Sequence, residues 1–205
     1  MNVWRNRLAL AVAILAASGN AFGEEASRSP DASEMPLFAA VLTFCFDTGA
    51  RPDAVKAAIE AAGGTLHSSG ATDWPFAMTV TGWDYVLGDH DMIISAVTSR
   101  IPASKERPEI NMNDCIVTSF ASEDASVASL GKWVGVPPSG NSSAERTTYH
   151  FQLVGGRRMA MDPTQSATRT ARAEGREWNL VVVQRRSDQV TVQVNNIKAT
   201  SQPPH

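Results

Sequence analysis

Cysteines, charged residues and the common catalytic motifs are all scarce in this chain of 205 residues. Two cysteines are too few for a disulfide-rich miniprotein. The sequence has no CxxC motif, which argues against redox chemistry and a zinc site. Charged residues make up 19% of the chain and the net charge is −3, which gives no electrostatic reason to expect nucleic acid. The phosphate-binding, dinucleotide-binding, zincin and serine-hydrolase motifs are also missing, so we predict no cofactor.

The first 23 residues have the pattern of a signal peptide. Arg5 and Arg7 precede the apolar run Leu8–Ala17, and Ala21-Phe22-Gly23 supplies small residues for cleavage before Glu24. Ten apolar residues span only about 15 Å as a helix, half of a hydrocarbon core of about 30 Å, so a membrane anchor is disfavoured. We therefore expect a soluble periplasmic or secreted protein with no transmembrane segment. Losing two arginines and no acids changes its net charge from −3 to −5.

The two cysteines are expected to form a disulfide bond after export. Cys45 lies in the apolar sequence FCF and Cys115 in DCIV, which are typical of buried half-cystines in an oxidising compartment. The bridge would close a loop of about 70 residues, which contributes about 4 kcal/mol in the chain-entropy model.

The apolar periodicity predicts an α+β fold. Residues 24–36 form a flexible lead-in and 199–205 a tail, which leaves 37–198 as one α+β domain; the loop 135–146 is where it would divide if it had two parts. The element order is ααβββα followed by ββββ, with the helices on one side of a mainly antiparallel sheet. The expected helices are 37–48, 52–62 and 122–135, and the expected strands are 76–87, 92–97, 115–120, 149–153, 159–161, 178–184 and 189–194.

Asp89-His90-Asp91 is the densest group of residues that could carry chemistry. Three consecutive side chains rarely converge on one ion, and polar residues are common in turns, so we predict no metal here. The turn remains a candidate edge of a cleft in a small-ligand-binding protein or a hydrolytic enzyme.

Charge is distributed unevenly along the chain. Residues 24–143 hold 7 basic and 16 acidic side chains, whereas 144–205 hold 9 and 5. Arginine holds carboxylates and phosphates bidentately, and two arginine pairs fall at expected hairpin turns. We hypothesise that these four side chains share one face that binds an envelope protein or an anionic envelope component; alternatively they are solvated and neutralised by the acidic half. The pairs are Arg157 with Arg158, and Arg185 with Arg186.

Four tryptophans could line a ligand groove. Their positions in strand patterns or at a helix end favour a role in the core instead. They are Trp74, Trp83, Trp133 and Trp178.

Residues 37–135 resemble small exported proteobacterial proteins of uncharacterised function. The resemblance is carried by a first helix containing FCF, an alanine-rich helix (AVKAAIEAAGG), the strand DCIV and an amphipathic helix. The sequence departs from it at GGTLH, where such proteins commonly have a tryptophan. The resemblance implies a bacterial periplasmic setting and transfers no site residues.

Together these observations favour an exported, non-enzymatic binding or interaction module for another envelope component. The alternative is the small-ligand-binding protein or hydrolytic enzyme with a cleft near Asp89-His90-Asp91.

Overall fold

The computed structural model describes residues 35–73, 75–104, 108–140, 142–162 and 176–199. The chain twice runs through a helical segment and then four strands. The first half comprises α1 (Pro36–Ala40), the π-helix η1 (Val41–Phe46), α2 (Pro52–Ala61), β1 (Thr65–Thr72), β2 (Ala77–Leu87), β3 (His90–Ile101) and β4 (Ile110–Ser119). The second half comprises α3 (Asp124–Val134), β5 (Arg146–Val154), β6 (Arg157–Ala160), β7 (Glu177–Arg185) and β8 (Val190–Ala199).

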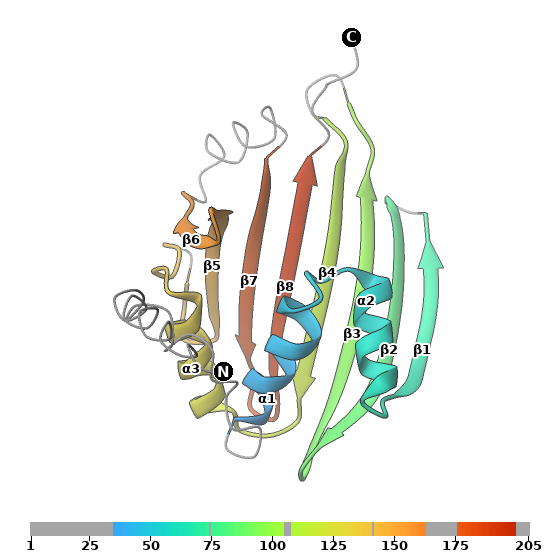
Figure 1. The fold of residues 1–205 in the computed structure, drawn as a ribbon, viewed down its shortest axis with the longest axis vertical. Helices are drawn as coiled ribbons and strands as arrows, with labels where there is room; N and C mark the ends of the chain where they lie inside the picture. Colours follow the sequence, from blue (N-terminus) through green and yellow to red (C-terminus); the bar gives the residue numbers. More distant parts are fainter. Residues whose placement is uncertain (1–34, 74, 105–107, 141, 163–175, 200–205) are drawn as a thin grey trace, which may run out of the picture.

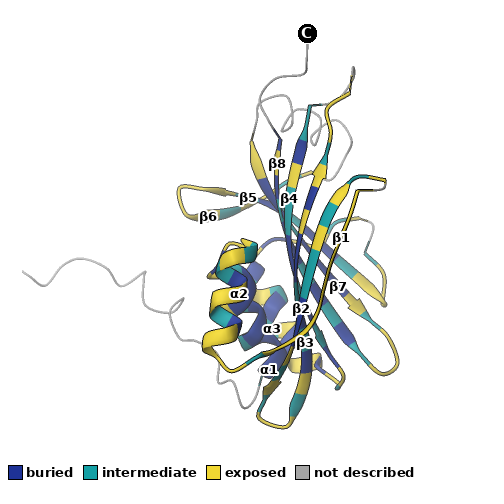
Figure 2. Cartoon of the chain, turned by 90° about the vertical axis from the view of Figure 1, so that its right-hand side faces the viewer, coloured by how far each residue is buried: buried dark blue, intermediate teal, exposed yellow. Residues whose placement is uncertain are grey.

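All eight strands belong to one antiparallel sheet with the order β1-β2-β3-β4-β8-β7-β5-β6 (Figure 1). The two halves join at its centre, where β4 pairs with β8 from Ile110↔Ala199 to Ser119↔Val190. All the helices pack against one face of the sheet (Figure 2). The predicted α+β class, with helices on one side of an antiparallel sheet, is therefore confirmed. None of the described helices is long and apolar enough to cross a membrane.

The predicted element order is correct except for one missing strand. The sequence pattern predicts three strands before the last helix, whereas the structure has four there. The additional strand is β1. Its sequence, TLHSSGAT, is exposed at every position, so it lacks the alternation that reveals a half-buried strand. The first helix was expected to be continuous but divides into α1 and η1. The expected signal peptide (1–23) and Trp74 lie outside the described residues, as do the lead-in up to residue 34 and the tail from residue 200.

The main core fills the space between the helices and the sheet. Leu37 and Val41 from the first helical segment and Leu130 from α3 are almost fully buried, together with Ile94 and Val192 from the sheet. These residues recur at helical spacing or on alternate strand positions, as burial of one face requires. Trp83 and Trp178 are also buried, which confirms their expected core role.

The opposite face of the sheet carries a second, smaller apolar cluster. Ile110, Ile197 and Trp178 form its centre on β4, β8 and β7. Asp114 lies on the same face and is 7% exposed, and one of its carboxylate oxygens has no hydrogen-bond partner among the described residues. Burial raises the pKa of Asp114 to about 6, against a smaller opposing effect of a hydrogen bond with Gln193.

Candidate functional site

A cavity of about 570 Å³ opens on the helix side of the sheet, beyond the ends of η1 and α3. A cavity of this size suits a small ligand. Its walls come from the η1–α2 connection, the end of α3 and strands β4 to β8. The residues lining it are Cys45, Phe46, Asp47, Gly49, Ala50, Arg51, Asn113, Trp133, Phe151, Leu153, Arg158, Glu177, Asn179, Val194, Asn196 and Lys198.

Three asparagines form a row across the floor of the cavity. Asn113 on β4 pairs in register with Asn196 on β8, which pairs with Asn179 on β7. The Asn196 amide donates to Glu177 and, at 3.4 Å, to the Asn179 Oδ1 atom. The Asn113 side chain makes no hydrogen bond to another described residue. Asparagine is uncommon in strands, so this row presents unusual donor and acceptor capacity toward the cavity.

The connection from η1 to α2 forms the wall opposite this floor. Its chain turns through two residues in the left-handed region, Gly49 with φ 62° and Ala50 with φ 54°. A left-handed conformation costs a residue with a Cβ roughly 1–2 kcal/mol, so the surrounding structure must impose it on Ala50. The Thr48 hydroxyl contributes by donating to the Phe44 and Cys45 carbonyls, at 2.6 and 3.2 Å.

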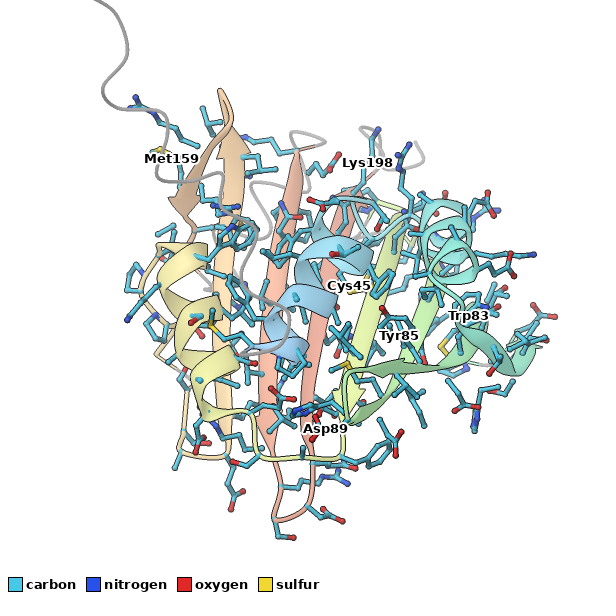
Figure 3. The ribbon with its side chains drawn as sticks, turned by 60° about the horizontal axis from the view of Figure 1, so that its bottom comes forward. Cys45, Trp83, Tyr85, Asp89, Met159 and Lys198 are labelled. Carbon is cyan, nitrogen blue, oxygen red and sulfur yellow. A yellow bond between two sulfur atoms is a disulfide. The ribbon has the colours of Figure 1, made fainter. Side chains whose placement is uncertain are left out.

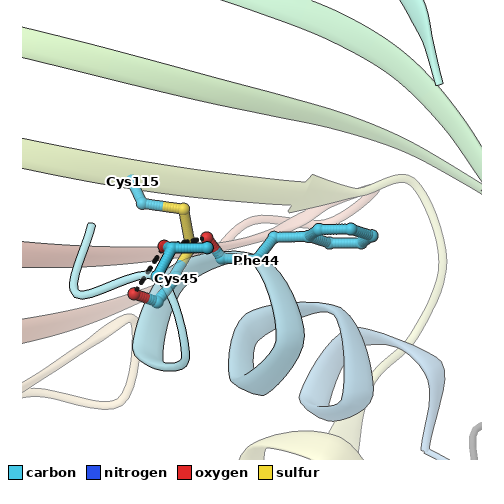
Figure 4. The surroundings of a disulfide bond; sticks show 4 residues. Phe44, Cys45 and Cys115 are labelled. Carbon is cyan, nitrogen blue, oxygen red and sulfur yellow. Dashed lines mark hydrogen bonds between the residues drawn. A yellow bond between two sulfur atoms is a disulfide. The ribbon is translucent and has the colours of Figure 1, made fainter. Parts of the chain in front are cut away.

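The disulfide bond fixes this wall to the sheet (Figure 4). Cys45 at the end of η1 is bonded to Cys115 on β4, with their Cα atoms 5.3 Å apart, which confirms the predicted pairing. Both cysteines are fully buried. Because Cys45 also lines the cavity, the bridge sets the distance between the η1–α2 connection and the asparagine row.

Three cations line the cavity without pairing with a carboxylate of the described residues: Arg51, Arg158 and Lys198. Arg158 lies over Trp133, 3.4 Å from the ring centroid, and its Nη1 donates to the Trp133 carbonyl at 3.1 Å. Burial lowers the pKa of the Arg158 guanidinium, because losing water disfavours the charged form. Arg51 donates from Nε to the Thr48 carbonyl at 3.1 Å. The acidic residues lining the cavity are Asp47 and Glu177.

The four arginines singled out from the sequence do not share one face. Arg157 and Arg158 begin β6 and pair with Val154 and Leu153 at one end of β5. Arg185 ends β7 next to Gln184, which pairs with Arg146 at the other end of β5. The four arginines therefore do not form a single surface, which corrects the hypothesis. The two pairs lie at opposite ends of β5. Arg185 is instead 3.8 Å from Asp124.

The turn Asp89-His90-Asp91 lies at the opposite end of the molecule from Lys198 (Figure 3). The His90 Nδ1 atom is 3.2 Å from the buried carboxylate of Glu123, and its Nε2 is 3.4 Å from the Asp89 carboxylate. Within the described residues, no three His, Cys, Asp or Glu side chains are grouped as metal ligands.

Glu123 is the residue near this turn that the sequence did not single out as a site. It accepts hydrogen bonds from the hydroxyls of Ser119 at 2.9 Å and Ser126 at 2.6 Å. Both hydroxyls are thus directed at the carboxylate and not at the His90 imidazole. Neither of these two serines is therefore placed as a nucleophile for His90.

Sequence reasoning identified Arg158 but missed most of the cavity. Trp133 packs against the main core, as expected, but it is only half-buried and also lines the cavity. The asparagine row could have been suspected from three asparagines in strand-like sequence, but their alignment depends on the β4–β8 pairing. Comparison with known proteins found no matching family model, no similar curated protein and no similar solved structure. The resemblance to exported proteobacterial proteins thus stays a prediction.

Proposed function

We propose that this chain is an exported, non-enzymatic binding protein that holds an anionic envelope component of small size in the cavity beside Trp133. The observation that carries the proposal is the Arg158 guanidinium, which is partly withdrawn from water and forms no ion pair with a carboxylate of the described residues. A desolvated cation without a counter-charge is unfavourable, so a ligand carboxylate or phosphate would stabilise the site.

The other walls of the cavity suit the same ligand. Trp133, Phe46 and Phe151 offer aromatic surface, while Asn113 and Asn179 offer amide groups that can both donate and accept. Arg51 and Lys198 add positive charge at the wall and floor. The combination is that of a ligand site with an apolar lining and a few fixed polar groups.

Export remains part of this proposal. The buried disulfide supports an oxidising compartment, because such bonds are rare where thiols are kept reduced. A native mass spectrum of protein made with its own leader in a bacterial periplasm tests two points at once. We expect a chain that begins at Glu24, and we expect a retained small anion that is released on unfolding.

Anilinonaphthalene sulfonate, an anionic aromatic dye, is a suitable probe of the cavity. We expect the folded protein to bind it, and Arg158→Gln to weaken that binding about tenfold by removing a charge-assisted hydrogen bond. Arg186→Gln, at the opposite end of the sheet, is the matched control and should leave dye affinity unchanged. Equal affinities for all three proteins would contradict a site at Arg158.

A further inference from the structure

The hairpin β5–β6 extends past its neighbour in the sheet. β5 pairs with β7 as far as Phe151↔Asn179. Its last residues, from Gln152 to Val154, pair with β6. The connection is the two-residue turn Gly155-Gly156, with φ 57° and 79°, and positive φ at both positions is what a type I′ turn requires. The hairpin consequently projects from the body of the molecule on the helix side (Figure 2).

The end of this hairpin is unusually apolar for a projecting turn. Leu153, Val154 and Met159 are 59%, 56% and 55% exposed. Leu153 pairs with Arg158 and lines the cavity, whereas Val154 and Met159 lie on the opposite face of the ribbon. Apolar side chains therefore extend from both faces of the tip.

The charge of the hairpin has one sign. From Arg146 to Met161 the sequence contains three arginines and no acidic residue. Arg157 is exposed, lies beside the apolar tip and forms no ion pair within the described residues. Such a tip, flanked by cations that pair with no carboxylate of the described residues, is complementary to a surface with negative charge over an apolar interior.

We propose that the β5–β6 tip inserts into the surface of an anionic lipid bilayer. Such membranes attract basic segments close to their surface, and aliphatic side chains gain free energy when they enter the acyl boundary. A bilayer can surround both faces of a narrow ribbon at once. A stable protein–protein interface typically buries about 800 Å² per side, whereas the exposed apolar surface here comes from three side chains of one narrow hairpin.

The proposal does not rest on ligand binding in the cavity, because Val154, Arg157 and Met159 do not line it. It is tested by co-sedimentation of the full mature protein, disulfide intact, with vesicles. One set contains phosphatidylglycerol and phosphatidylcholine, and the other contains phosphatidylcholine alone. We expect sedimentation with the anionic vesicles, weakened by salt because part of the attraction is electrostatic.

The variant Val154→Thr/Met159→Gln should lower the partition coefficient at least about tenfold, because it removes the apolar tip. The matched control is Leu66→Thr/Val86→Thr, which changes two side chains of similar exposure (64% and 59%) on β1 and β2. The control should bind like the wild type. Arg157→Gln should reduce the salt dependence. Failure of the wild type to sediment, or equal binding by the tip variant, would overturn the proposal.

Insertion itself has a direct readout in Met159→Trp, which places a fluorophore at the tip. After the wild-type spectrum is subtracted, the emission of this tryptophan on anionic vesicles should shift to shorter wavelength. Brominated acyl chains should quench it. Emission that stays typical of water while the protein is vesicle-bound would overturn insertion. Loss of dye binding by Arg158→Gln would be a separate result, bearing on the cavity alone.

Discussion

The two halves of the molecule have the same outline but are covered differently. In the first half, α1, η1 and α2 lie over β3 and β4, and a disulfide bond holds η1 to β4. In the second half, α3 is the one helix among the described residues, and it precedes four strands. Its end at Val134 leaves the helix-side surface of β7 and β8 open around Asn179 and Asn196.

The difference explains where the cavity lies. The first half supplies a rigid wall, and the second half supplies an open floor with its polar residues. A second helix over the second half would fill this space with side chains. Uneven coverage of the two halves by helices therefore creates the candidate site.

The largest effect is expected from removing the covalent link of the first half. Replacing Cys45 and Cys115 together by alanine should lower the free energy of unfolding by about 4 kcal/mol, since the bond closes a loop of 70 residues. Urea denaturation measures this change. Reduced wild-type protein should give a similar loss, and an unchanged urea midpoint would show that packing alone holds the first half.

The next effect concerns Asp114, where the halves meet between β4 and β8. Its pKa in the folded protein, about 6, exceeds the ordinary value of 3.8, so the protonated carboxyl favours folding. This contribution is fully present below about pH 4 and is lost as the pH rises through 6. Asp114→Asn should then stabilise the protein by up to about 3 kcal/mol at pH 8 and by almost nothing at pH 4.

Urea denaturation of both proteins from pH 4 to pH 8 checks this prediction. Glu109→Gln is a useful control, because hydrogen bonds from Arg100 and Asn111 lower the pKa of that exposed carboxyl. Because that pKa lies below the ordinary value of 4.5, the effect of Glu109→Gln on stability should stay nearly constant from pH 5 to pH 8. A gain from Asp114→Asn that does not vary with pH would show that the carboxyl does not titrate differently on folding.

Glu123 links the last strand of the first half to the helix of the second half. It accepts from Ser119 at the end of β4 and from Ser126 in α3, so Glu123→Ala leaves two buried hydroxyls without their acceptor. We expect a loss of about 2 kcal/mol. Asp124→Ala, at the exposed neighbour, should cost about 0.5 kcal/mol through the helix dipole. Equal losses in thermal unfolding would argue that Glu123 acts only as the residue preceding the first turn of α3.

The smallest effect belongs to Arg185. Its 3.8 Å contact with Asp124 is at the surface, where such pairs contribute little. Arg185→Gln should change stability by about 0.5 kcal/mol or less and should leave dye binding unchanged. A large loss of dye affinity would restore a role for both arginine pairs.

The sequence was informative wherever one face of an element is buried. Alternating or helical apolar spacing predicted the fold class and seven of the eight strands. The pairing of Cys45 with Cys115 followed instead from two cysteines in apolar surroundings and the expected export. β1 was missed because its residues are exposed on both faces, and the π-helix because its apolar spacing from Val41 to Phe46 resembles that of an α-helix.

The cavity could not be predicted because its residues come together by long-range pairing. Asn113 and Asn196 are neighbours through the β4–β8 register, and local sequence carries no information on that pairing. The four arginines were expected on one face for a related reason. Composition showed that Arg157 and Arg185 both sit near turns, but it could not show that the turns lie at opposite ends of β5.

The central pairing of β4 with β8 also dictates an order of assembly. β4 ends at Ser119 and its partner begins at Val190, so the middle of the sheet waits for the last strand to be synthesised. Until then β4 is an open edge with an apolar helix-side face. Both cysteines are already present by residue 115, so the disulfide can close over that face before the second half arrives. Once the chain is in an oxidising compartment, the bridge would thus hold η1 against β4 while that strand still has an open edge that invites mispairing.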